Sequence, residues 1–326
     1  MKRDLLYVAL FAAAVTALAL VLQSGVALNF LMMALYATLL AQAWNLLGGW
    51  GGQFSFGHAL FFGVGAYAQA LAQLQWGLNP WLALPLAAAL AAGMGTLTGW
   101  LSFRYGLKGS YFALVTLAFA EVARIAAVSV GFTGGGVGLM LPLNESFANM
   151  QFGSRRGALL LVLGLVVLAL IATLWLKHSR FGARLQAVRD NEDAARAVGI
   201  DPLFIKLGAI TLSAAFMGAA GAFYLQVFQY IDPGIAFGPA TSVEALVGAI
   251  VGGIGTVWGP VLGALVLHAL ADVTRNLFGQ LPGINMVIYG GVLVLIVVFV
   301  PRGISGLGAS LRGAWGAQRK GRDDGR

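Results

Sequence analysis

The feature that most constrains the fold of this chain is a series of apolar segments, each about twenty residues long. The clearest runs from Gly157 to Leu176 and contains no charged residue. A helix of about twenty apolar residues spans the hydrocarbon core of a bilayer, which is about 30 Å thick. Charged residues make up only 10% of the 326, against roughly 25% in a soluble domain. We therefore expect an all-α, polytopic integral membrane protein.

Hydropathy predicts about ten membrane-spanning helices, some of them broken by glycines. The first begins after Lys2 and Arg3, and its apolar run of eighteen residues is longer than the core of a usual signal peptide, so we expect it to stay in the membrane. The predicted spans lie near residues 5–22, 28–47, 54–75, 81–103, 109–130, 157–176, 203–229, 241–257, 260–278 and 283–300.

The basic residues are distributed unevenly over this topology. Sixteen of the 20 fall in four segments on one face: the amino terminus, residues 104–108, residues 177–206 and the tail from 301. Because cytoplasmic loops are enriched in Lys and Arg, we expect both termini in the cytoplasm. The net charge of +8 thus indicates membrane orientation, and we expect no nucleic-acid partner. Residues 1–308 form the predicted transmembrane domain, and the basic tail at 309–326 is predicted to be disordered.

The longest strongly polar segment between apolar blocks is Lys177–Lys206, which we expect to be a cytoplasmic loop. Asp190 is placed to cap a short helix, Gly199 to close it, and Asp201-Pro202 to begin the next helix. The short helix is small and apolar along much of its length, so it could lie in a groove of another protein. An amphipathic helix resting on the bilayer surface fits the same pattern. The residues that would make the protein contact are Glu192, Asp193, Ala194, Ala195 and Gly199.

Asn45–Tyr67 has the sequence NLLGGWGGQFSFGHALFFGVGAY, with seven glycines. Each glycine costs a helix about 1 kcal/mol relative to alanine, so we expect the chain to break or to pack very tightly here. Two interpretations fit. Either polar side chains beside the break face a water-filled path, or the small residues serve helix packing and nearby carbonyls satisfy the polar groups. Under the first interpretation the pathway residues are Gln53, Ser55, Gly57 and His58.

A second Gly-rich run lies at Val247–Gly263. The predicted topology makes spans two to five enter the membrane from outside and spans seven to ten enter from inside, and each quartet holds one Gly-interrupted segment. This arrangement is the one expected of an inverted repeat around a pathway.

Few ionisable side chains fall within the predicted spans. Glu121 and Arg124 are three residues apart, hence on one helical face, and an internal ion pair that lowers the cost of both charges is the simpler interpretation. Glu244 opens the eighth span and is expected in its first turn. With His58 and His268, these groups are scattered, which disfavours a proton relay.

Several classes of function lack their motifs in this chain. The glycine clusters are not followed by Gly-Lys-Ser/Thr, so we expect no ATP binding by the chain itself and no other cofactor. No His-Glu-x-x-His pair or Gly-x-Ser-x-Gly elbow occurs, so we expect no catalytic residue and no enzyme. With no cysteine and three histidines, we expect no metal site.

Several segments resemble, in order, blocks of the LivM and LivH type of permease subunit in ATP-driven branched-chain amino acid importers. They are Asn45–Tyr67, TLAFAEVARI at 116–125, TGGGVGL at 133–139, SVEALVGAIVGGIGTVWGPVLGALV at 242–266 and FVPRGISGLG at 299–308, the later ones similar to the LivM branch. RDNEDAARAVGID at 189–201 resembles the loop that these permeases insert into their ATPase subunits, with Glu192, Ala194, Ala195 and Gly199 at the matching positions. The outer loop near 140–156 is short for the family.

The resemblance implies an importer complex in the bacterial inner membrane. It would contain this chain, a second related permease, two cytoplasmic ATP-binding subunits and a periplasmic substrate-binding protein, with membrane lipid around the spans. Closure of the ATPases would move the loop helix at 190–199 and tilt the spans in alternating access. Branched-chain amino acids or related small polar solutes are the cargo that the resemblance implies. The alternative is an ion-coupled secondary transporter of small solutes, which an inverted repeat would also suit.

Overall fold

The computed structural model describes residues 1–278, 287, 290–291, 294 and 303–306. This part of the chain is helical apart from its loops and one antiparallel ribbon, in which β1 (Leu139–Met140) pairs with β2 (Tyr230–Ile231). The helices are α1 (Lys2–Val21), α2 (Gly25–Asn45), the π-helical turn η1 (Leu46–Trp50), α3 (His58–Leu74), α4 (Pro80–Arg104), α5 (Gly109–Ser129), the short turns η2 (Gly131–Thr133) and η3 (Gly135–Val137), α6 (Arg155–His178), α7 (Arg180–Asp190), α8 (Glu192–Ala197), α9 (Pro202–Phe228), α10 (Pro233–Phe237), α11 (Pro239–Gly252) and α12 (Gly259–Phe278).

Seven segments of the described chain are long and apolar enough to cross a membrane. They are α1, α2 with η1, α4, α5, α6, α9, and α10 together with α11. This finding confirms an all-α, multi-pass membrane protein. Each of the first nine predicted spans overlaps a helix of the described chain, whereas the span predicted near 283–300 lies largely outside the described residues and the tail at 309–326 entirely so.

The third span begins later than its hydropathy indicates. Residues 51–57 are not helical, and α3 starts at His58 and has 17 residues, which makes it about 26 Å long. This is less than the thickness of a bilayer core. The glycines that precede α3 therefore break the helix, as the sequence predicts.

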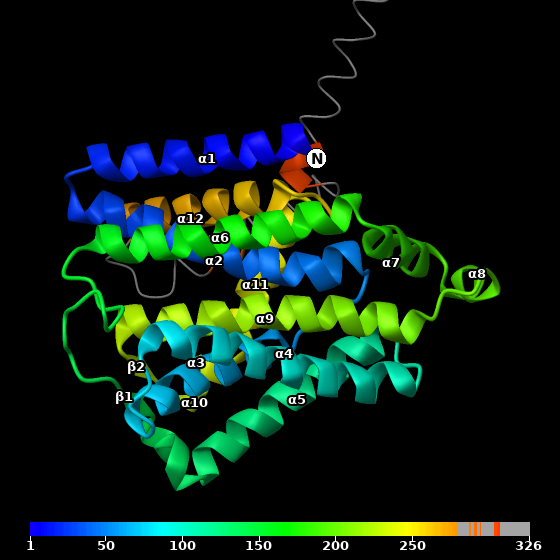
Figure 1. Ribbon diagram of the computed structural model, residues 1–326, viewed down its shortest axis with the longest axis horizontal. Helices are drawn as coiled ribbons and strands as arrows, with labels where there is room; N and C mark the ends of the chain where they lie inside the picture. Colours follow the sequence, from blue (N-terminus) through cyan, green and yellow to red (C-terminus); the bar gives the residue numbers. More distant parts are fainter. Residues whose placement is uncertain (279–286, 288–289, 292–293, 295–302, 307–326) are drawn as a thin grey trace, which may run out of the picture.

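The helix α9 lies at the centre of the bundle, where it packs against α2, α3 and α4. Its contact with α3 depends on glycine, because a Cβ at Gly65 would overlap the backbone carbonyl of Gly218. Small residues at such crossings let two membrane helices approach backbone to backbone. The helices α1 and α5 lie at opposite edges of the bundle (Figure 1).

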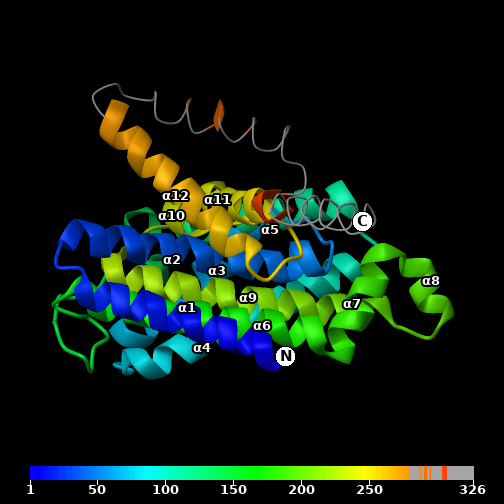
Figure 2. The ribbon, with the colours of Figure 1, turned by 90° about the horizontal axis from the view of Figure 1, so that it is seen from above.

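The two ends of the bundle differ. Helices α7 and α8 project beyond the long helices at one end (Figures 1 and 2), while the β1–β2 ribbon lies at the other (Figure 1). The start of α1 is at the α7 end, where the Asp4 carboxylate accepts a hydrogen bond of 2.9 Å from Lys177 Nζ and lies 2.8 Å from His178 Nε2. The amino terminus and the predicted coupling loop thus share one face of the protein.

Candidate functional site

Helix α8 begins at a side-chain cap. The backbone of Asn191 is extended, and its Oδ1 accepts hydrogen bonds from the backbone N–H groups of Asp193 (3.1 Å) and Ala194 (3.0 Å). The prediction that Asp190 is this cap was wrong by one residue, since Asp190 is the last residue of α7. Asp193 remains in the first turn, as predicted, where a carboxylate favours the helix dipole.

Gly199 follows the end of α8 and adopts the left-handed conformation, with φ of +83°. In this turn the N–H of Ile200 donates to the carbonyl of Ala195 at 3.0 Å, and the N–H of Gly199 donates to the carbonyl of Arg196 at 3.0 Å. Only glycine adopts this backbone without a steric cost. Both ends of α8 are therefore fixed by local sequence, and Asp201 caps α9 directly afterwards through Leu203 N–H at 2.9 Å.

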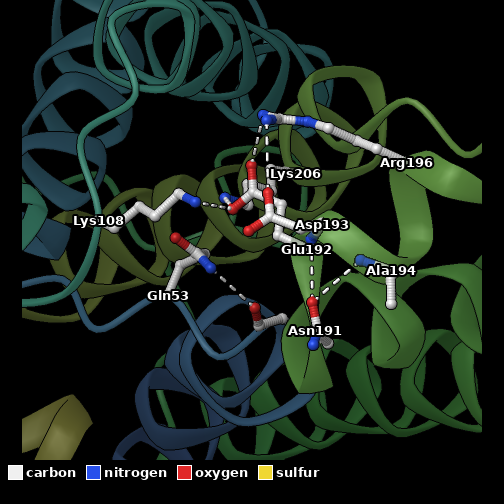
Figure 3. Close-up of polar contacts among 9 residues, drawn as sticks. Gln53, Lys108, Asn191, Glu192, Asp193, Ala194, Arg196 and Lys206 are labelled. Atoms are coloured by element: carbon white, nitrogen blue, oxygen red, sulfur yellow. Dashed lines mark hydrogen bonds and ion pairs between the residues drawn. The ribbon is translucent and has the colours of Figure 1, made fainter.

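The Glu192 carboxylate is the centre of an ion-pair cluster (Figure 3). It accepts hydrogen bonds from Lys206 Nζ at 2.7 Å and Arg196 Nη2 at 2.9 Å, and it pairs with Lys108 Nζ at 3.1 Å. Burial raises the pKa of this carboxyl, but the hydrogen bonds from Lys206 and Lys108 outweigh burial and hold its pKa below the ordinary value. The cluster joins α8 to α9 and to the loop between α4 and α5.

The surface of α8 is divided between its own protein and solvent. Ala195 is buried against the chain, whereas Asp193, Ala194, Ala197 and Val198 are exposed. Of the predicted contact residues, Glu192 and Ala195 thus hold α8 in place. Asp193, Ala194 and Gly199 are exposed on the surface that the described residues form.

Helix α7 links this cluster to the Gly-rich break. Arg189 donates from Nη1 to the carbonyl of Gly49 at 3.3 Å, and its aliphatic stem covers Gly52, which has φ of +66°. Leu185, which is buried, lies beside Gly51. The two segments that the sequence marks as functional are therefore in direct contact.

The buried part of the break contains three of the predicted pathway residues. Ser55 accepts a hydrogen bond of 3.2 Å from the N–H of Gly57, which lies against the backbone of Thr116 in α5. His58 opens α3, and its Nε2 is 2.9 Å from the hydroxyl of Ser213 in the middle of α9. The fourth residue, Gln53, is only partly buried and donates to the carbonyl of Gly51 at 3.1 Å (Figure 3).

The protonation of His58 follows from its partner. The Ser213 hydroxyl donates to the carbonyl of Ala43 at 2.6 Å, so it can only accept from the imidazole. His58 Nε2 therefore carries the proton, and Nδ1 is a buried acceptor without a hydrogen-bond partner among the described residues. A small donor, such as a water molecule, would satisfy it.

The second Gly-rich run meets the first. Asn45 near the end of α2 donates to the carbonyl of Thr256 at 2.9 Å and accepts from the N–H of Gly255 at 2.8 Å. Gln42 donates to the carbonyl of Val257 at 2.8 Å. The break between α11 and α12 thus packs on the break between α2 and α3.

The starts of α3 and α11 also meet. Ser242, in the first turn of α11, accepts a hydrogen bond of 2.8 Å from the N–H of Ala59 in the first turn of α3. This contact places the starts of α3 and α11 together inside the bundle.

Glu121 and Arg124 form the predicted ion pair but not an internal one. Arg124 donates from Nε to Glu121 at 2.9 Å and from Nη2 at 2.6 Å, and the two side chains are 47% (Glu121) and 36% (Arg124) exposed. These fractions place the pair on an outward face of α5, which lies at the edge of the bundle (Figure 1).

Glu244 lies in the second turn of α11, not in the first as predicted, because the helix begins at Pro239. It lines a cavity of about 120 Å³ together with His268.

Four residues of these clusters were missed by sequence reasoning: Lys108, Arg189, Asn191 and Lys206. Two of them carried a signal: Asn191 is a good helix cap, and Lys206 is a lysine in an apolar segment. Lys206 lies in the second turn of an apolar span and is almost fully buried, and a lysine in that position needs an acid nearby.

The chain resembles known transport proteins over most of its length. A family model described as branched-chain amino acid transport system permease component matches residues 26–297. The high-affinity branched-chain amino acid transport system permease proteins LivM of Escherichia coli K12 and Salmonella typhimurium are each 31% identical to it, over 80% and 83% of this chain. A probable branched-chain amino acid transport permease protein LivH of Methanocaldococcus jannaschii is 27% identical over 75% of it.

The chain does not span the whole of these relatives. The aligned part covers 65% of the Escherichia coli LivM protein, 68% of the Salmonella one and 80% of the archaeal LivH. The family model, however, covers well over half of the present chain. The protein therefore belongs to the family of permease components of branched-chain amino acid transport systems.

Proposed function

We propose that the protein is the transmembrane permease subunit of an ATP-driven importer for branched-chain amino acids or related small polar solutes. Its family and the LivM relatives support this assignment. The observation that carries it is the double anchoring of α8, by Glu192 to Lys206 and by α7 to the Gly-rich break. A helix that only rested on a bilayer would not need these contacts to the moving parts of a bundle.

In this proposal α8 is the element on which an ATPase subunit acts. The exposed groups Asp193, Ala194 and Gly199 meet the ATPase, while Ala195 and Glu192 keep α8 rigid. A displacement of α8 is carried to α9 through Lys206, to the loop before α5 through Lys108, and to the break through Arg189. The chain binds no ATP or other cofactor in this proposal, because separate subunits bind and hydrolyse the nucleotide.

The proposed topology has ten spans, arranged as an inverted repeat with both termini in the cytoplasm. Two features support the repeat: non-helical stretches follow η1 (residues 51–57) and α9 (residues 229–232), and helices α3 and α11 begin in contact at Ala59 and Ser242. The pairing of the amino terminus with α6 through Asp4 and Lys177 supports a shared cytoplasmic face for the terminus and α8.

The proposed pathway runs beside the break that contains Ser55, Gly57 and His58, with Gln53 at its cytoplasmic edge. Ser55 and His58 are fully buried in this conformation, so solute reaches them only when the break opens. Nδ1 of His58, which has no hydrogen-bond partner among the described residues, supports a path that admits small donors. In the proposed complex a second related permease, two ATP-binding subunits and a periplasmic binding protein surround this one.

The decisive experiment is uptake by the purified complex in proteoliposomes. We expect both ATP-binding subunits to copurify with this chain and accumulation of leucine, isoleucine or valine to require ATP and the binding protein. In a parallel preparation, the chain carrying Ala195→Trp is expected to insert into the membrane without supporting uptake. Uptake that proceeds without the ATP-binding subunits and collapses with an ionophore would replace the proposal with an ion-coupled secondary transporter.

A further inference from the structure

One face of α5 is left uncovered by the rest of the described chain. Six of its exposed residues recur at alternating intervals of three and four: Tyr111, Leu114, Ala118, Glu121, Ile125 and Val128. Val122 and Ala126 are exposed beside them. We call these six residues the α5 stripe. Residues with this spacing form the seam along which one helix packs against another. Figure 1 shows α5 at the edge of the bundle, where such a seam is available.

Glu121 lies in the central part of this stripe, and its partner Arg124 lies beside the stripe, nearly one turn further along α5. Glu121 is about 18 Å along the axis from the start of α5 at Gly109 and about 12 Å from its end at Ser129. Glu121 is therefore well inside the hydrocarbon layer, whereas Arg124 lies about 8 Å from the end of α5 at Ser129. The Glu121 side chain is too short to reach the bilayer surface from that depth, and Arg124 can turn toward the surface only by leaving this partner.

The pair is not self-sufficient in hydrogen bonds. A guanidinium has five N–H donors, and Arg124 uses two of them on Glu121. Within the described residues Arg124 makes no other hydrogen bond, and the Glu121 carboxylate receives none but these two. Lipid tails can neither accept nor donate, so a bilayer facing this pair would leave those groups unsatisfied.

The rest of the stripe is apolar and bulky. Tyr111 and Leu114 lie on one side of the pair and Ile125 and Val128 on the other, with exposed fractions between 44% and 74%. A wall of a water-filled channel would not be expected to carry such large apolar groups at both ends. A protein surface that is apolar with one polar centre matches the stripe better than either lipid or water.

We propose that the α5 stripe is the surface on which this chain packs against the second membrane-spanning permease subunit. The partner presents hydrogen-bond acceptors at mid-membrane depth, opposite the free donors of Arg124, and apolar side chains on either side of them. This inference rests on the proposed function, in which two permeases form one transporter. It adds which helix makes the contact and what chemistry the partner must offer.

The absence of cysteine from the chain permits a direct test. Leu114→Cys and Ile125→Cys each introduce a single thiol on the stripe, and Leu168→Cys places one at a similarly exposed position on α6 (exposed fractions 60%, 53% and 56%). Each variant complex is labelled in its native membrane with a benzophenone maleimide, irradiated and analysed by mass spectrometry. We expect adducts with the second permease from residues 114 and 125 and none from residue 168.

A charge reversal separates a docking role from local charge neutralisation. The double variant Glu121→Arg/Arg124→Glu keeps an ion pair on the same face but turns its donors toward the former position of the acid. We expect about tenfold less second permease to copurify with it, a change equal to about 1.4 kcal/mol. Arg124→Lys, which keeps the charge and loses the planar fork, should have a smaller effect.

The outcomes distinguish this inference from the proposed function. Lipid adducts alone from residues 114 and 125, or undiminished copurification after charge reversal, would overturn the stripe as the interface. If the second permease and the ATP-binding subunits still copurify with the unmodified chain, the importer function survives that result. If no second permease copurifies with the unmodified chain, both proposals fail together.

Discussion

The Lys206 ammonium lies 2.7 Å from the Glu192 carboxylate and thereby joins α8 to the central helix α9. The side chain of Lys206 is only 4% exposed, so it depends on this acid for its charge. The contact connects the most protruding helix of the protein with the one that packs on most of the bundle.

Glu192→Gln should uncouple transport from ATP hydrolysis. The amide cannot neutralise Lys206, and removal of one partner from a buried pair costs about 3–5 kcal/mol. We expect ATP-driven uptake to fall by about tenfold or more, which corresponds to 1.4 kcal/mol, while the chain still inserts. Glu145→Gln is the matched control, because Glu145 is exposed in the loop between β1 and α6 and its change leaves the cluster with Lys206 intact. Equal loss of uptake in both variants would contradict the role given to Glu192.

The attachment of α8 should depend on pH in one direction. The pKa of Glu192 is held below its ordinary value of 4.5, so the stabilisation is fully present above 4.5 and is lost as the pH falls through the lower folded value. Hydrogen exchange of residues 192–200 should be unchanged between about pH 5 and 8, when corrected for intrinsic rates, and rise below that range. This rise in the exchange rate at low pH should be absent from Glu192→Gln. A rise near neutral pH would show that another group controls the attachment of α8.

Gly199→Ala should weaken the end of α8 through its backbone alone. A Cβ at this position meets no atom within 4 Å, but φ is +83°, a conformation that costs an L-residue about 1–2 kcal/mol. We expect reduced uptake, with partial recovery in Gly199→Asn because asparagine tolerates this region. Gly164→Ala is the control: it also meets open space, but inside α6, where alanine is favourable. Hydrogen exchange of the α8 amides, measured as a function of temperature, gives the local loss of stability.

Ser213→Ala should destabilise the start of α3. It leaves the buried Nε2–H of His58 without an acceptor, at a cost of about 1–3 kcal/mol. His58→Leu in the same background should recover part of the loss, because the buried imidazole N–H that lacks an acceptor is then removed. Ser129→Ala, on the exposed end of α5, should have little effect on the melting temperature. Additive effects of the His58 and Ser213 changes would exclude the inferred hydrogen bond.

Asn45→Leu should loosen the contact between the two Gly-rich breaks. It removes the bonds to Thr256 and Gly255 while it keeps a side chain of similar size, and we expect a loss of about 1–3 kcal/mol in stability. Asn144→Leu, at an exposed outer position, serves as the control. The melting temperature of the purified complex gives the comparison, and a basal solute leak in proteoliposomes would show that the contact also closes the path.

Hydropathy predicted the fold class because each span must satisfy its own backbone in lipid, which makes span length a local property. The helix end at Gly199 and the break before His58 were predictable for the same reason, since glycine acts within a turn. The cap was misplaced from Asn191 to Asp190 because both residues are good caps and one position separates them.

The contacts of Glu192 with Lys108 and Lys206, and of Asn45 with Gly255, depend on how distant helices pack. Nothing local in the sequence specifies them. The face that a span turns toward lipid or protein is equally hard to predict, because both surroundings are apolar. This is why Glu121 and Arg124, predicted as an internal pair, are found on the outward face of α5.

Asn45 has a consequence for how the protein can open. One amide binds the backbone of the segment between α11 and α12 while it belongs to the helix that leads into the other break. Neither break can separate from its neighbour while that amide keeps both bonds. Asn45 thus acts as a latch beside Gln42, and the two Gly-rich breaks can move apart only in a step that gives up these bonds together.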